Sequence, residues 1–135
     1  MTSSPFGSGP RECPCGSGLR YDACCGPLHD GAPAATAEAL MRSRYAAYAL
    51  GLEDHVFRTW HPATRPADLT ATPGLVWTGL DVVAVRDGGA GDDTGQVEFR
   101  ARYRSAGAEH ELHEVSRFER RHGRWVYVDG TLERA

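Results

Sequence analysis

The segment LHEVSRFERRHGRWVYVDG, residues 112–130, determines the predicted fold. Two runs of alternating apolar and polar side chains flank His122 and Gly123, and this pattern is typical of two β-strands joined by a two-residue turn. In that register Phe118 lies opposite Tyr127, and Ser116 lies opposite Asp129. The segment therefore predicts an antiparallel hairpin with one apolar face.

Two further strands precede this hairpin. The stretch QVEFRARYRS, residues 96–105, alternates strictly, and LVWTGLDVVAVRDG, residues 75–88, is rich in β-branched and aromatic side chains. The glycines and aspartates of residues 87–95 indicate a turn between them. We expect four antiparallel strands, with the row Arg100, Arg102 and Arg104 as a surface of ion pairs.

Residues 33–60 change to helical spacing. Apolar residues recur at steps of three and four, Thr36 is a plausible N-cap, and Gly51 is a plausible stop. A second short helix is expected over residues 53–60, burying Val56, Phe57 and Trp60, while residues 26–34 are expected to be a linker. The prediction is an α+β fold, with two helices packed on a curved four-stranded antiparallel sheet.

Composition narrows the class of protein. The chain has 135 residues and a formal net charge of -3, which makes nucleic acid an unlikely main partner. No apolar run is long enough to span a bilayer, and the first residues lack a secretory signal. We therefore expect a cytoplasmic protein with no membrane association, whose thiols stay reduced.

All four cysteines lie in CPCGSGLRYDACC, residues 13–25. Disulfides are disfavoured in a reducing compartment, and the C-x-x-C spacing of redox relays is missing. Four thiolates on a short loop that turns at Gly16 and Gly18 favour a closed structural zinc site instead. The predicted ligands are Cys13, Cys15, Cys24 and Cys25. We expect Arg11 and Arg20 to offset the charge, and His29 to be a solvated loop residue.

The cysteine segment resembles the SEC-C zinc motif, which runs C-P-C-G-S-G, Tyr, then Cys followed by His or Cys. Cys13, Cys15 and Cys24 match its three fixed positions, and Cys25 takes the last one. The resemblance implies zinc as the bound metal and a protein partner that recognises the motif.

The order of helices and strands resembles the nuclear-transport-factor-2-like fold, also described as a cystatin-like cone around a cavity. Together with the SEC-C motif, the segments at 59–66, 97–103 and 112–130 are similar to the YchJ family of small bacterial proteins. This resemblance implies a SEC-C segment at 11–28 and an α+β domain at 33–135. It implies little about function, because the family is largely uncharacterised.

We expect the cone to hold a small ligand or only a core. The predicted cavity residues are Trp60, Tyr103, Glu114, Ser116, Tyr127 and Asp129. The preferred interpretation is a non-catalytic zinc-binding adaptor or binding protein. The alternative is an enzyme of the isomerase or hydrolase kind, although no nucleophile and base stand at catalytic spacing. Val126 and Val128 are predicted on the outer face, where a second copy of the chain or the zinc segment would cover them.

Overall fold

The computed structural model describes residues 11–69 and 74–133. The prediction that the first residues lack a secretory signal falls on residues 1–10, which lie outside these ranges. None of the described helices is long and apolar enough to cross a membrane.

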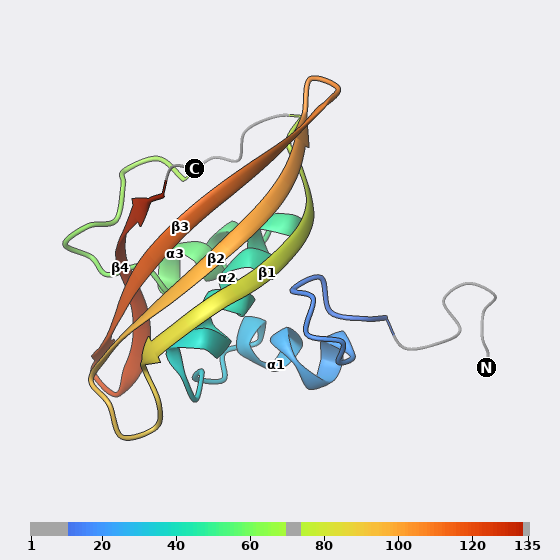
Figure 1. Cartoon of the computed structure of the whole chain (residues 1–135). Helices are drawn as coiled ribbons and strands as arrows, with labels where there is room; N and C mark the ends of the chain where they lie inside the picture. The colour runs from blue at the N-terminus through green and yellow to red at the C-terminus, as the bar shows by residue number, and fades with distance from the viewer. Residues whose placement is uncertain (1–10, 70–73, 134–135) are drawn as a thin grey trace, which may run out of the picture.

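Four antiparallel strands form one sheet in the order β1-β2-β3-β4, as the sequence predicts (Figure 1). The strands are β1 (Val76–Asp87), β2 (Thr94–Ser105), β3 (Ala108–Arg121) and β4 (Arg124–Leu132). His122 and Gly123 both have positive φ, at 53° and 79°, as a type I′ hairpin turn requires.

The predicted register holds only for the first half of the β3–β4 hairpin. Phe118 does lie opposite Tyr127, but a register shift follows, so that Arg117 faces Asp129 and Ser116 faces Gly130. Such a bulge turns the later side chains to the other face. Asp129 consequently forms an ion pair with Arg117 at 2.6 Å, on the face away from the helices.

The helical layer consists of α2 (Ala37–Leu50) and α3 (Glu53–Arg58), preceded by the short helices η1 (Tyr21–Ala23) and α1 (Cys25–His29). The Thr36 hydroxyl accepts a hydrogen bond from the Ala39 N–H at 3.0 Å, and Gly51 ends α2 in a left-handed conformation. Both ends of α2 were predicted.

Two predictions about the shorter helices are wrong. The expected linker at residues 26–34 contains α1, in which Pro27 occupies the first turn and removes no intrahelical hydrogen bond. In α3 the Val56 side chain is buried, but Phe57 is 45 % exposed and lies beneath the Arg65 guanidinium.

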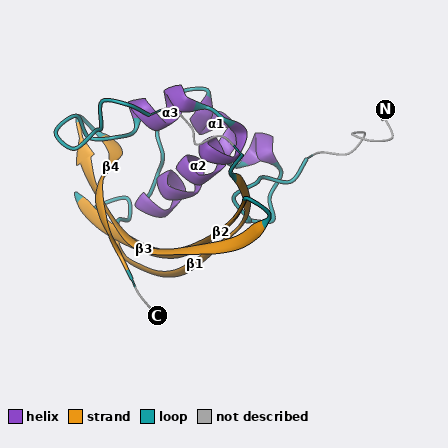
Figure 2. Ribbon diagram, turned by 90° about the horizontal axis from the view of Figure 1, so that it is seen from above, coloured by secondary structure: helices purple, strands orange, loops and turns teal. Residues whose placement is uncertain are grey.

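The helices fill the hollow of the curved sheet (Figure 2). Leu40, Met41 and Tyr45 of α2 form the core with Val97, Ala101, Phe118 and Trp125 of the sheet. The start of α2 lies against the β1–β2 connection, where the Ala37 N–H donates to the Gly88 carbonyl at 2.9 Å. This contact fixes the helix on the sheet.

The opposite face of the sheet carries ion pairs. Arg100 pairs with Glu111, Arg102 with Asp81 and Arg104 with Glu109, so the predicted surface of paired charges is confirmed.

The free side of β4 is lined by residues 59–64 of the same chain. Trp60 forms a parallel bridge to Tyr127, and the Tyr127 N–H donates to the Thr59 carbonyl at 2.8 Å. The Thr64 hydroxyl donates to the Val128 carbonyl further along the strand. Val126, predicted to need an external partner, is only 8 % exposed within the single chain.

Candidate functional site

The four cysteine sulfurs form a compact cluster. All four Sγ atoms lie within 4.8 Å of one another, with 3.6 Å between Cys15 and Cys24 and 3.9 Å between Cys24 and Cys25. A tetrahedral zinc ion with Zn–S bonds of about 2.3 Å needs sulfurs about 3.8 Å apart. The spacing of these thiols therefore fits one tetrahedral metal ion.

The loop between the cysteine pairs turns as predicted. Gly16 and Gly18 have φ of 80° and 85°, values that residues other than glycine rarely adopt. The Cys13 N–H donates to the Leu19 carbonyl at 2.8 Å and closes the turn. The Ser17 hydroxyl lies 3.2 Å from the Cys24 sulfur.

Hydrogen bonds among the thiols distinguish Cys15 from Cys25. The bond from Cys25 is the main cause that lowers the pKa of Cys15 to about 4, and the same bond raises the pKa of the donor Cys25. One thiolate is thus already stabilised before the other thiols deprotonate, and deprotonated sulfur is the form that binds metal.

Of the two arginines expected to offset the charge, Arg20 pairs instead with Asp22 at 2.9 Å. Arg42 of α2, which was not predicted, donates to the Cys15 carbonyl at 2.8 Å and also pairs with Glu38 at 3.1 Å. Arg42 comes from a distant part of the sequence, so spacing within the loop could not indicate it.

The cysteine segment belongs to the protein core. Cys13, Cys15 and Cys25 are at most 4 % exposed and lie in the same buried cluster as Leu40 and Val97. His29 is not a solvated loop residue. Its Nδ1 accepts from the Tyr21 hydroxyl at 2.6 Å and its Nε2 donates to the Ser43 carbonyl at 2.8 Å. This side chain therefore joins the cysteine segment to α2.

His55 lies beside His29 and is 3 % exposed. Burial, and then the charges of His29 and Arg58, lower its pKa to about 4 from the ordinary histidine value of about 6.5. Arg44 of α2 acts in the same direction, and Asp54 opposes it. His55 is therefore neutral at physiological pH.

A prediction follows for the pH dependence of stability. The folded state binds the His55 proton more weakly than the unfolded state does. The contribution of His55 to the free energy of unfolding is therefore fully present above about pH 6.5, and roughly 3 kcal/mol is lost as the pH falls towards 4. Replacing His55→Gln should flatten this part of the profile, measured by denaturant unfolding of both proteins at each pH. Acid release of any metal bound by the cysteines would affect both proteins equally, so parallel profiles would contradict the assignment.

A second candidate site is a cavity of about 340 Å³ between α2 and the concave face of the sheet. Aromatic and aliphatic side chains form most of its wall. The residues that line it are Met41, Arg44, Tyr45, Tyr48, Trp60, Trp77, Phe99, Ala101, Leu112, Glu114, Ser116, Phe118 and Tyr127.

The structure places four of the six predicted cavity residues here: Trp60, Glu114, Ser116 and Tyr127. Asp129 is excluded because the bulge turns it to the other face. Tyr103 has the expected strand phase, but its ring packs between Trp77 and His110, towards the end of the sheet, and does not line the cavity.

Sequence reasoning did not propose Arg44 as a site residue. Its side chain is 6 % exposed, its Nη1 donates to the Val56 carbonyl and the Thr59 hydroxyl, and its guanidinium lies over the rings of Trp60 and Tyr127. The signal was present in the sequence, because Arg44 falls within the apolar stripe of the predicted helix.

Glu114 is the carboxylate of this cavity. It accepts hydrogen bonds from the Ser116 hydroxyl at 2.6 Å and the Tyr127 hydroxyl at 3.2 Å. Burial, reinforced by Glu114, raises the pKa of Tyr127, which keeps the phenol protonated as a donor. The cavity thus combines aromatic walls with one buried cation and one hydrogen-bonded carboxylate.

Comparison with protein families identifies two matching models. Residues 36–130 match the model described as "YchJ, middle NTF2-like domain", and residues 12–27 match the SEC-C motif. Among bacterial relatives, a UPF0225 protein of Streptomyces coelicolor is 55 % identical over 119 residues, covering 87 % of this chain and 93 % of the relative. A UPF0225 protein of Cupriavidus metallidurans is 52 % identical over 133 residues, covering 93 % and 92 % of the two chains.

Two solved structures have a similar fold. A SEC-C motif containing protein from Rhodopseudomonas palustris is 40 % identical, with a TM-score of 0.78, and the match covers 90 % of this chain and 98 % of that one. A sec-c motif containing protein from Psychrobacter arcticus is 30 % identical, with a TM-score of 0.71, covering 91 % and 83 %.

Proposed function

We propose, from the premise that this chain belongs to the YchJ family, that it is a zinc-stabilised binding protein whose concave cavity takes a small ligand. Four soft thiolates at tetrahedral spacing suit zinc, and a complete set of four protein ligands suits a structural site. When bound, the metal would supply cross-linking of the N-terminal segment and no open position for reacting molecules.

The buried Arg44 is the observation that carries the ligand proposal. A guanidinium taken out of water costs free energy unless a partner compensates for it. Arg44 donates to a backbone carbonyl and a hydroxyl and lies over two aromatic rings, but it forms no ion pair with any described carboxylate. The ligand best suited to this cavity is a largely apolar, ring-containing molecule with one neutral polar group that accepts a hydrogen bond from Arg44 and donates one to Glu114.

The exposed side of the cysteine segment supports an adaptor role in addition. Leu19, at the tip of the turn between the cysteine pairs, is 54 % exposed. A rigid turn held by the metal and bearing an exposed leucine is a suitable contact for a protein partner. Because the cysteines themselves are packed into the core, the proposed recognition element is this turn.

A thermal-shift screen of ring-containing metabolites tests the ligand proposal. A ligand at about 100 times its dissociation constant adds about 2.7 kcal/mol to the free energy of unfolding. Glu114→Gln keeps the shape of the side chain and should weaken the best ligand about tenfold, because it removes the charge. Fluorescence of Trp60 and Trp77, which line the cavity, reports occupancy directly.

The matched control is Glu98→Gln. Glu98 pairs with His113 at 2.6 Å and does not line this cavity, so this variant should bind like the unmodified protein. Equal loss in both variants, or ligands that leave the tryptophan fluorescence unchanged, would refute the cavity as the binding site.

An enzyme remains the second candidate because Glu114 and Tyr127 form a carboxylate–phenol pair inside an apolar cavity. The same ligands distinguish the two functions. Chemical conversion of a bound ligand that stops in Glu114→Gln would favour an isomerase or hydrolase, whereas recovery of the unchanged ligand favours a binding protein.

A further inference from the structure

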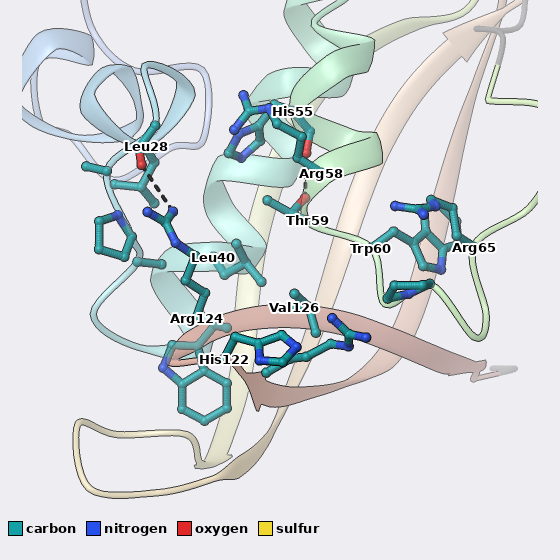
Figure 3. Close-up of a pocket in the computed structure, with 17 residues that line it drawn as sticks. Leu28, Leu40, His55, Arg58, Thr59, Trp60, Arg65, His122, Arg124 and Val126 are labelled. Atoms are coloured by element: carbon teal, nitrogen blue, oxygen red, sulfur yellow. Dashed lines mark hydrogen bonds between the residues drawn. The ribbon is translucent and has the colours of Figure 1, made fainter.

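A different cavity, of about 310 Å³, lies on the other side of Trp60 (Figure 3). Its wall is formed by residues 28–34, α3, the loop that follows α3, and the β3–β4 turn. Leu40 and Val126 supply apolar surface. This cavity is separate from the concave one, and Trp60 is the residue that they share.

The charge of this cavity is one-sided. Four arginines and two histidines line it, and none of the described lining residues is acidic. The basic residues are His55, Arg58, Arg65, Arg121, His122 and Arg124. Figure 3 shows labelled members of this set approaching from α3, from the loop after it, and from the β3–β4 turn.

The arginines here differ from those on the outer face of the sheet. There Arg100, Arg102 and Arg104 each pair with a carboxylate. At the cavity Arg58 pairs with Asp54, but Arg65, Arg121 and Arg124 form no ion pair with a described carboxylate. Arg65 and Arg124 donate instead to backbone carbonyls, which leave their positive charge uncompensated.

Buried nitrogens without partners gather at the same place. Within residues 11–69 and 74–133, three buried side-chain nitrogens lack a hydrogen bond: His55 Nδ1, Trp60 Nε1 and Trp125 Nε1. All three side chains line this cavity, and His55 and Trp125 are 3 % and 2 % exposed. A buried polar atom left unpaired costs about 1–3 kcal/mol, so three of them at one cavity favour the binding of a polar group there.

The donor pattern of these nitrogens is defined. The Ser43 hydroxyl donates to the Leu40 carbonyl, so it accepts from His55 Nε2 at 2.9 Å and leaves Nδ1 as an acceptor. The two indole N–H groups are donors. An anion that keeps one O–H group, or whose charged group stands next to a hydroxyl, offers oxygen acceptors for the two indole N–H groups and an O–H donor for His55 Nδ1.

We propose that this cavity binds a small molecule carrying a phosphate or carboxylate group. Guanidinium groups bind such planar or tetrahedral oxyanions through paired, charge-assisted hydrogen bonds. The volume suits a compact ligand, whose apolar part would lie on Leu40 and Val126. This proposal is additional to the proposed ligand binding in the concave cavity and does not depend on it.

The chain contains three tryptophans, and their indole N–H signals in a ¹H–¹⁵N spectrum give a site-specific measurement. Inorganic phosphate and malate, a carboxylate next to a hydroxyl, are titrated at constant ionic strength maintained with chloride. The Trp60 and Trp125 signals should shift in a saturable way with at least one of the two probes. The Trp77 signal, from the concave cavity, should not shift. A response to phosphate alone or to malate alone identifies the class of oxyanion.

The variant that tests the arginines is Arg65→Gln with Arg124→Gln, which should weaken the apparent affinity at least about tenfold. Its matched control is Arg100→Gln with Arg104→Gln, which changes the net charge equally on the outer face and should bind as before. If the first pair fails to fold, Arg121→Gln at the exposed rim should weaken binding in its place. Absence of saturation with both probes, or equal weakening in the control, would overturn the proposal.

Discussion

Removal of the metal with a chelator is expected to lower the midpoint of thermal unfolding by more than about 10 °C, which corresponds to about 3 kcal/mol for a chain of this size. Cys13, Cys15 and Cys25 are buried among core residues. Without a metal these sulfurs keep their buried positions but lose the bonds that hold them there. Differential scanning calorimetry before and after chelation, with metal content measured in parallel, provides the test.

The substitution Cys15→Ser should reproduce this loss and reduce the bound zinc below one ion per chain. Cys15 is 0 % exposed, and a hydroxyl is a poorer zinc ligand than a thiolate. Ser17→Ala is the matched control, because it removes the hydroxyl near the Cys24 sulfur but no ligand. A Cys15→Ser protein with full zinc content and unchanged stability would show that the cluster is not a metal site.

Gly95→Ala is expected to destabilise the protein by about 1–3 kcal/mol, a decrease of about 3–10 °C in the midpoint of thermal unfolding. A methyl group at residue 95 would lie 2.5 Å from Gly88 Cα and 3.2 Å from Ala37 Cβ. The first of these atoms belongs to the backbone and cannot move away by a change of rotamer. The added methyl group must therefore push apart β1, β2 and the start of α2.

Gly91→Ala in the same connection is the control. Residue 91 is exposed, a methyl group there meets no atom within 4 Å, and its φ is not in the left-handed region. This variant should unfold at the same temperature as the unmodified protein in the same thermal unfolding experiment. Equal stability of the two variants would mean that the close approach of Gly88 and Gly95 is not needed for packing.

The strand and helix pattern was predictable because it rests on local chemistry. Alternation in residues 96–105, the His122–Gly123 turn, the Thr36 cap and the Gly51 stop are each determined by a few neighbouring residues. The cysteine cluster was predictable for the same reason, since thirteen residues contain all four cysteines. Family resemblance added the overall arrangement, which the matching models support.

The errors arise where distant segments meet or where one residue changes the register. The bulge between Arg117 and Phe118 removed Asp129 from the concave face, and no local signal distinguishes a regular hairpin from a bulged one there. His29 was assigned to solvent because its partners, Tyr21 and Ser43, are determined by how the cysteine segment docks on α2. The second cavity, which is lined by four arginines, is likewise assembled from four segments that lie far apart in the sequence.

The backbone pairing of residues 59–61 with Tyr127 has a consequence for self-association. An outermost strand that offers unpaired amide and carbonyl groups is a template on which another polypeptide can add and begin aggregation. Here the chain occupies part of that template with its own loop. At the other margin of the sheet, two register shifts in β1 interrupt the regular ladder. Growth of the sheet from one molecule into the next is therefore disfavoured at both margins.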